Sequence, residues 1–260
     1  MQPTYLPWMG YFDLMDQVNH FVVLDDVQFS KGSWQHRNRI KTPNGLEWLS
    51  IPVIVHGRLG QLITDVKVRV PLFWKDHLAK IEANYGGARF FGKIFRKLSE
   101  IYEKTAVSCS LVEINLGLLR WLTATLGIAT PLVRSSTLLV NGRRTERLVA
   151  MCQALGATEY LSPLGAAAYL LDDLEHFKRG GIEVSFHNYT HPTYRQLHPL
   201  FLPFASALDL LFNEGAGALS IIRNGRGPTF SPNQVLQSTL ARESESLHRP
   251  MVAQFQTRRD

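Results

Sequence analysis

Two neighbouring carboxylates, Asp25 and Asp26, are followed closely by side chains that can bind phosphate. Within fourteen residues the chain carries Lys31, His36, Arg37, Asn38 and Arg39. Arginines bind phosphate through paired hydrogen bonds, and a carboxylate-bound Mg²⁺ neutralises the same phosphate oxygens. The segment therefore predicts a site for a divalent cation and a phosphate, against the alternative that the two acids form an ordinary turn.

We assign roles within this segment by residue type. Asp25 and Asp26 are the predicted metal ligands. The predicted catalytic residues are Asp25, Asp26, Lys31 and His36. The predicted substrate contacts are Gln28, Arg37, Asn38 and Arg39.

The first residues of the chain form a second candidate binding segment. Residues 2–10 contain two prolines and two aromatic side chains, and a glycine ends the segment just before a helical pattern. Glycine allows a close backbone approach, and amides at a helix N-terminus favour an anion. We expect nucleotide contacts from Gln2, Tyr5, Trp8, Gly10 and Tyr11. The alternative is a rigid turn in which Tyr5 and Trp8 belong to the core.

The second half of the chain supplies four further candidates. Ser162 lies in a strand-to-helix turn that can hold a phosphate, although a serine before a proline is also a common start of a helix. His191, Tyr194 and Gln196 follow a predicted strand and are expected to contact substrate. Zinc is disfavoured because no carboxylate or cysteine separates His191 from His198. The sequence also lacks a P-loop, a nucleophile elbow and an H-E-x-x-H motif.

The elements that position these residues alternate along the chain. Strands are predicted at residues 19–24, 47–55, 62–70, 131–137, 159–162 and 182–187. Helices are predicted at residues 11–18, 71–85, 88–103, 113–126, 145–155, 164–178 and 203–213. Strands separated by helices favour parallel pairing. The predicted fold is α/β: a Rossmann-like, mostly parallel sheet with flanking helices, a small β-rich insertion and a C-terminal helical and loop region.

The loop at residues 2–10 has no strand before it. In an open α/β sheet, a ligand-binding loop follows the carboxyl end of a strand. We therefore expect an apolar strand of about five to eight residues ahead of Met1, placed centrally in the sheet.

Composition indicates a globular protein in the cytoplasm. Hydrophobic residues make up 45% and charged residues 19% of the chain, a balance that excludes disorder throughout. No apolar run approaches the roughly 18 residues of a membrane span, and no signal peptide precedes the first motif. Cys152 lies in an apolar helical pattern, which predicts a buried thiol.

The net charge of +6 is divided unevenly along the chain. Residues 223–260 contribute six arginines and three acids, or +3, so residues 1–222 carry the other +3. We expect residues 1–222 to form one α/β domain, and residues 223–260 to be a polar, partly disordered tail that is removable after Pro228 with little loss of stability. The modest charge fits a small phosphate-bearing substrate and disfavours nucleic acid, apart from a tRNA donor.

Several runs of sequence resemble the WbqC-like protein family. They are QPTYLPWMGYFDLM, FVVLDDVQFSKGSWQHRNRIK, GATEYLSPLGAAAYL and FASALDLLFNEG. The resemblance covers about residues 1–215 and implies a connection with gene clusters for O-antigen and other bacterial surface polysaccharides. Against the family pattern, His36 stands where Asn is common, and the apolar strand before QPTYLPW is missing.

A broader similarity of architecture concerns the use of ATP. The order of turn, helix and acid-ended strand is similar to that of HIGH-motif nucleotidyltransferases and pantothenate synthetase, which activate a carboxylate with ATP. The histidines of those enzymes are absent here, with Trp8 and Tyr11 nearby instead. This similarity implies ATP as a cofactor, and the two adjacent carboxylates, Asp25 and Asp26, imply Mg²⁺ beside it.

Three functional hypotheses follow. The first is ATP-dependent transfer of an acyl or aminoacyl group to the amine of a nucleotide-linked amino sugar. The second is the same transfer from an already activated donor, without ATP. The third is a noncatalytic sugar-binding or scaffold protein of a polysaccharide pathway, which would tolerate substitution of Asp25 and Asp26.

Overall fold

The computed structural model describes residues 1–238. Its helices are α1 (Met9–Asp16), α2 (Phe73–Tyr85), α3 (Phe91–Ala106), α4 (Leu111–Leu126), α5 (Arg144–Ala154), α6 (Ala167–Leu170), α7 (Leu174–Arg179), α8 (Ala207–Glu214) and α9 (Ala218–Asn224). Its strands are β1 (Phe21–Val23), β2 (Arg37–Thr42), β3 (Gly45–Ser50), β4 (Leu132–Arg134), β5 (Glu159–Pro163) and β6 (Glu183–His187). The α/β class is confirmed.

The strands form three separate pairs. β1 is parallel to β4, β5 is parallel to β6, and β2 and β3 form an antiparallel hairpin. The hairpin overlaps only the first of the two strands predicted at residues 47–55 and 62–70. The described residues therefore contain small parallel sheets and not one continuous sheet.

Two predicted elements differ from the structure, and one observed strand was not predicted. The predicted strand at residues 62–70 is a 3-10 turn, Ile63–Asp65, followed by isolated bridges such as Val53 with Val68. The predicted helix at residues 164–178 is divided into α6 and α7 by the 3-10 turn Leu171–Asp173. β2 was not predicted, because its inward side chains include Asn38 and Lys41 and thus break the apolar alternation that marks a strand.

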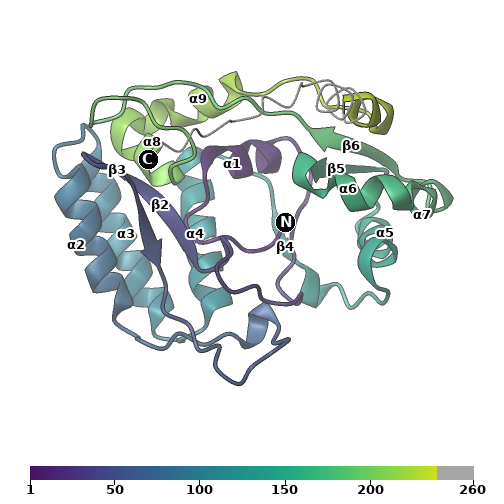
Figure 1. Ribbon diagram of the computed structural model, residues 1–260, viewed down its shortest axis with the longest axis horizontal. Helices are drawn as coiled ribbons and strands as arrows, with labels where there is room; N and C mark the ends of the chain where they lie inside the picture. Colours follow the sequence, from purple (N-terminus) through teal and green to yellow (C-terminus); the bar gives the residue numbers. More distant parts are fainter. Residues whose placement is uncertain (239–260) are drawn as a thin grey trace, which may run out of the picture.

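Two hydrophobic cores hold these elements together. The larger core contains α1 to α4, α8 and β1, with fully buried residues such as Phe12, Leu119 and Phe212. α2, α3 and α4 lie side by side in it (Figure 1). The smaller core contains α5 to α7, β5 and β6, including Phe177 and Cys152. Cys152 is the buried thiol that the sequence predicts, and burial raises its pKa to about 11.

The first part of the predicted tail packs against both cores. Arg223 and Arg226 form ion pairs with Asp16 of α1. Phe230 pairs with β6, and Val235 is buried in the smaller core. Packing thus continues beyond residue 222 and includes Phe230 and Val235, while most other side chains of residues 229–238 are exposed. The division of the chain at residue 222 stays a prediction. Residues 239–260 lie outside the described residues.

No helix within residues 1–238 combines the length and the apolar character needed to cross a bilayer.

Candidate functional site

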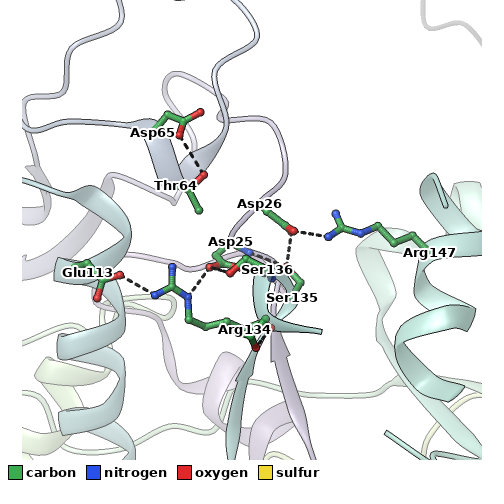
Figure 2. A network of polar contacts seen from close by, with 10 residues as sticks. Asp25, Asp26, Thr64, Asp65, Glu113, Arg134, Ser135, Ser136 and Arg147 are labelled. Carbon is green, nitrogen blue, oxygen red and sulfur yellow. Dashed lines mark hydrogen bonds and ion pairs between the residues drawn. The ribbon is translucent and has the colours of Figure 1, made fainter. Parts of the chain in front are cut away.

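Asp25 lies at the carboxyl end of β1 and is enclosed by donors from the end of β4. The two strands are parallel, with Val23 opposite Arg134, so the residues that follow them meet at one edge. The buried Asp25 carboxylate accepts hydrogen bonds from Arg134 Nε at 2.6 Å and from the amide and hydroxyl of Ser136 at 3.0 and 2.8 Å (Figure 2). Asp25 therefore has a full set of protein partners.

Asp26 is the more accessible of the two carboxylates. It accepts a hydrogen bond from Ser135 Oγ at 2.5 Å and pairs with the guanidinium of Arg147 on α5 (Figure 2). Ser135 Oγ also lies 3.1 Å from Asp25, but its single proton goes to the nearer Asp26. The side chains of Asp26 and Arg147 are each 20% exposed. Asp26 is thus the carboxylate that a ligand can reach.

The electrostatics of this cluster favour the charged forms of Asp25 and Arg134. Burial alone would raise the pKa of Asp25, but hydrogen bonds from Ser136 and Arg134 outweigh it and hold the pKa below its usual value. Burial would likewise lower the pKa of Arg134, and contacts with Asp25 and Glu113 raise it instead. The cluster is a set of opposite charges that are largely neutralised within the protein.

The donor set at these carboxylates limits how a metal can bind. Across residues 1–238, no group of three or more His, Cys, Asp and Glu side chains is placed to hold a metal ion. A cation at Asp25 would have to displace Arg134 and two bonds from Ser136. Of the two aspartates, Asp26 is the more exposed, but a cation there would compete with Arg147 and Ser135, and the remaining ligands would have to come from substrate and water.

Residues 2–8 form a loop that leads into α1, and polar side chains hold this loop in place. Asn38 Nδ2 donates to the carbonyls of Tyr5 and Leu6 at 3.0 and 2.8 Å. The Tyr11 hydroxyl donates to the carbonyl of Gln2 at 3.1 Å. A Cβ at Gly10 would stand 2.3 Å from the Trp8 ring, so the glycine allows the ring to lie over the start of α1. The loop is therefore a rigid platform.

This loop and β2 enclose a cavity of about 230 Å³. Its lining is Met1, Thr4, Trp8, Tyr11, Trp34, Asn38, Arg39 and Phe204. Trp34 and Phe204 are 45% and 47% exposed, so the cavity opens to solvent between two aromatic side chains. Phe204 reaches it because the amides of Ser206 and Ala207 donate to the carbonyls of Arg39 and Pro7.

A row of arginine and tryptophan side chains continues from this cavity along the hairpin. The guanidinium of Arg39 lies 5.4 and 5.5 Å from the ring centres of Trp34 and Trp48. The guanidinium of Arg37 lies 4.3 Å from the Trp48 ring centre. Arg39 Nε is buried and has no hydrogen-bond partner in the described structure. The row presents positive charge and flat apolar faces together.

Two predicted substrate residues belong to the interior. The Tyr5 hydroxyl contacts His77 Nδ1 at 2.7 Å and also the Tyr102 hydroxyl, all inside the larger core. Ser162 is fully buried, and its hydroxyl faces the carbonyl of Pro163. The structure thus matches the core alternative for Tyr5, while Trp8 lines the cavity.

Other predicted residues shape loops near the site. His36 Nε2 accepts a hydrogen bond from the amide of Gly32 at 3.0 Å, and Nδ1 lies 3.1 Å from the carbonyl oxygen of Ile51. Both ring nitrogens therefore contact backbone groups. Lys31 and Gln28 are exposed.

His191 packs against Trp8, whereas Tyr194 and Gln196 bind buried groups. His191 stacks on the Trp8 ring with centres 6.0 Å apart. Tyr194 and Gln196 donate to the buried carboxylate of Asp209 at 2.6 and 3.0 Å. The side-chain NH₂ of Gln196 also donates to the carbonyl of Leu202, and its side-chain oxygen accepts from the amide of Leu202. These two bonds order the loop that carries Phe204.

Sequence reasoning missed several residues of the site. Arg134 and Ser136 lie within the predicted strand at residues 131–137, and the rule that parallel strand ends meet at one edge brings them to Asp25 only once the pairing of that strand with β1 is known. Arg147 is one of three arginines within residues 143–147, and nothing in the sequence indicates which of the three contacts Asp26. Phe204 lies in a loop, so its place in the cavity had no sequence signal.

Comparisons with known proteins agree on the family. The family model described as "WbqC-like protein family" matches residues 2–221. A protein of Mycobacterium tuberculosis, described as the uncharacterized protein Rv1507c, is 40% identical over 225 residues, which cover 86% of this chain and 96% of that protein. No solved structure matches the chain significantly. The chain belongs to the WbqC-like protein family.

Proposed function

We propose that this protein binds a nucleotide-linked amino sugar and forms an amide on the amine of that sugar, as a step in the biosynthesis of a bacterial surface polysaccharide. The cavity beside Arg39, lined by Trp8, Trp34 and Phe204, is the observation that carries the proposal. Aromatic faces stack on base and sugar rings, and guanidinium groups bind phosphate in a fixed geometry. Family membership supports the pathway.

The size of the cavity suggests how the substrate lies. At about 230 Å³ it is smaller than the roughly 300–1,000 Å³ of a typical small-molecule site, so it accepts one ring of the substrate. The rest of the molecule then extends over the arginine and tryptophan row, where Arg37 and Arg39 bind the phosphates. The buried, unpartnered Nε of Arg39 gains an acceptor in this arrangement.

The chemical step requires an acceptor for one proton. The sugar amine attacks the carbonyl carbon of the acyl donor, a C–N bond forms, the leaving group departs with its electron pair, and the amine loses a proton. We assign Asp26 as the proton acceptor, because it is the partly exposed carboxylate at the strand ends. His36 is left with a role in holding its loop, since both of its ring nitrogens contact backbone.

Activation of the donor by ATP is the form of the reaction that we favour. ATP would convert a donor carboxylate into an acyl group with a phosphate-containing leaving group. Asp26, substrate phosphates and water would hold the accompanying Mg²⁺, and Lys31 would add positive charge near the phosphates. The alternative is a transferase that uses an activated donor and needs neither ATP nor Mg²⁺.

One observation favours a noncatalytic protein instead. Both carboxylates are neutralised by arginines, Asp25 by Arg134 and Asp26 by Arg147. Such pairs also occur as purely structural features of a binding protein. In that case the cavity binds sugar, and substitution of Asp26 has no effect beyond stability.

Calorimetric titration with a panel of nucleotide-linked amino sugars tests the binding step. Trp34→Ala and Arg39→Lys should each weaken binding about tenfold or more, because each removes a stacking face or a bidentate contact worth at least about 1.4 kcal/mol. Arg58→Lys is the matched control, since Arg58 is exposed on another loop. Absence of binding to the whole panel would overturn the proposal.

Turnover assays then separate the three forms of the function. Each contains ATP, Mg²⁺, a set of carboxylates and the sugar that binds, and measures pyrophosphate, ADP and amide product. Amide formed with nucleotide cleavage supports the ATP-dependent reaction, and Asp26→Asn should slow it by about a hundredfold. Amide formed only from an activated donor identifies the transferase. Tight binding without product across the donor set identifies the binding protein.

A further inference from the structure

Lys41 is a buried lysine of β2 whose ammonium group contacts a loop far along the chain. The residue is only 2% exposed. Its Nζ donates to the side-chain oxygen of Gln196 at 3.4 Å, to the carbonyl of Pro199 at 3.2 Å and to the carbonyl of Leu200. An ammonium group carries three protons, so these three oxygens satisfy it fully. Lys41 therefore directs all of its hydrogen bonds to one segment, residues 196–200.

The loop of residues 196–204 continues to the cavity of the candidate site. Side chains two residues apart in a strand share a face, so Lys41 follows Arg39 on the face of β2 that borders this cavity. The carbonyl of Arg39 accepts from the amide of Ser206 at 2.8 Å. β2 thus contacts this loop near its start, through Lys41, and contacts the chain again just past the end of the loop.

Two residues of this loop adopt a strained backbone conformation. Leu200 and Phe204 have φ angles of 62° and 65°, in the left-handed region that is costly for a residue with a Cβ atom. Leu200 is 86% exposed, so apolar packing does not compensate for this cost. Such a conformation persists only where surrounding contacts hold it. The carbonyl of Leu200 is one of the groups that Lys41 binds.

Other contacts fix the loop on either side of Leu200 but do not reach that residue. Gln196 binds α8 and a later part of the loop. His198 Nε2 lies 2.8 Å from the carbonyl of Asn84 near the end of α2. In the part of the chain that the structure describes, Lys41 is the only hydrogen-bond partner of Leu200. Lys41 is therefore the contact that opposes the strain.

Phe204, at the end of this loop, forms one wall of the cavity. Its ring meets the Trp8 ring edge-on, with centres 5.4 Å apart. We propose that Lys41 is a positioning residue of the candidate site: by binding two carbonyls of the loop, it holds residues 196–204 in the strained shape that puts Phe204 against Trp8. The inference rests on the proposed function in taking this cavity as the place where the ligand binds.

Replacing the lysine by methionine separates this role from a role in the fold. A buried charge is costly, and its replacement by an apolar side chain of similar volume is often neutral for stability. Methionine is similarly long and unbranched, so it fills the space of Lys41. It has no N–H group, and the carbonyls of residues 199 and 200 are left free to turn toward solvent, because both residues are exposed. The loop is then released while the core stays packed.

The test compares Lys41→Met with Lys93→Met, a matched control at an exposed lysine of α3. Amide hydrogen exchange at Leu202 reports on the loop, and exchange in α4 reports on the core. The nuclear Overhauser effect between the rings of Phe204 and Trp8 reports on the cavity wall. Calorimetric titration with UDP-glucosamine measures binding, and circular dichroism gives the melting temperature.

We expect Lys41→Met to speed exchange at Leu202 at least about tenfold, to abolish the Phe204–Trp8 effect and to weaken binding at least about fivefold. Its melting temperature should stay within about 3 °C of that of Lys93→Met. An unchanged loop and ring contact would overturn the proposal, as would unchanged affinity. Failure to fold, or faster exchange in α4, would assign Lys41 to the core instead. A wild type that does not bind UDP-glucosamine counts against the proposed function alone, since exchange and the ring contact still test the position of the loop.

Leu200→Gly provides a second variant that leaves the buried lysine in place. Glycine adopts a positive φ without steric cost, so this substitution removes the strain that Lys41 opposes. In the Leu200→Gly background, Lys41→Met should therefore speed exchange at Leu202 by less than about threefold, compared with at least about tenfold in the wild type. Equal factors in the two backgrounds would show that the two residues act independently and would refute the proposal.

Discussion

Replacing Asp25 with asparagine removes one charge from a fully enclosed group while keeping its shape. The carboxylate accepts three hydrogen bonds from Arg134 and Ser136. The amide group of asparagine has one oxygen and one NH₂, so its NH₂ must face a donor of Arg134 or Ser136. At least one buried donor is then left without an acceptor.

The expected loss can be estimated from these contacts. An unsatisfied buried donor costs about 1–3 kcal/mol, and a buried ion pair that loses one partner costs about 3–5 kcal/mol. Arg134 is 27% exposed and keeps its contact with Glu113, which places the loss toward the lower end. We expect about 2–3 kcal/mol, or a decrease in melting temperature of about 5–10 °C for a chain of this size.

The dependence on pH separates this mechanism from a packing defect. The pKa of Asp25 is held below its unfolded value, so the stability gained from its charge is fully present above about pH 4 and is lost as the pH falls through the native pKa. The difference in melting temperature between the wild type and Asp25→Asn should therefore stay constant above about pH 4 and shrink as the pH falls below that value. Thermal unfolding followed by circular dichroism measures this directly.

Asp65→Asn is the matched control. Asp65 lies near the same cluster but is exposed, with one contact at 3.5 Å to the Thr64 hydroxyl (Figure 2). It should change the free energy of unfolding by less than about 0.5 kcal/mol. An Asp25→Asn variant as stable as this control, or a deficit that stays constant down to pH 3, would refute the assignment of Asp25 as a buried ion pair.

Three further predictions concern the core, the end of the described chain and the tryptophan row. Burial lowers the pKa of His77 to about 4, so wild-type stability should fall as the pH drops from about 6.5 toward 4, and urea unfolding of His77→Gln should show a flatter profile. A chain that ends at residue 228 loses Phe230 and Val235 and should melt at least about 5 °C below one that ends at residue 238; equal melting temperatures would show that these contacts contribute nothing. Trp48→Ala should weaken binding of a nucleotide-linked sugar less than Trp34→Ala does, because only Trp34 lines the cavity, and calorimetry that gives the reverse order would move the site onto the hairpin.

The sequence predicted the acidic end of β1 but not its partners. A short apolar run followed by two acids is a strong local signal, and the strand and its carboxylates are where it places them. The partners, Arg134 and Arg147, lie 109 and 121 residues further along the chain. Which strand pairs with β1 depends on packing across the whole domain, and local patterns carry no record of it. The same acids therefore suggested a metal site when taken alone.

Residue type alone also failed to distinguish aromatic side chains of the core from those that line the cavity. Tyr5 and Trp8 occur in one proline-rich turn, and both types are common in cores and in binding sites. Tyr5 finds polar partners inside the core in His77 and Tyr102, which come from helices far along the chain. Trp8 has no such partner and faces the cavity. Only the tertiary contacts separate the two roles.

The larger and smaller cores contact each other in part through charged groups. We call these contacts the joint, and their partly exposed ion pair of Asp26 with Arg147 responds to ionic strength. Asp26 pairs with Arg147 on α5, and both side chains are 20% exposed, whereas the contact of Asp13 on α1 with His187 of β6 at 2.7 Å is buried and is screened much less. Dissolved salt screens partly exposed charges strongly and leaves apolar contacts intact. Raising the salt concentration will therefore loosen the joint before either core melts, and unfolding will become less cooperative as it does so. Because Asp26 belongs to both the joint and the candidate site, an anionic substrate that engages this site will bind with an affinity that follows the same dependence on salt.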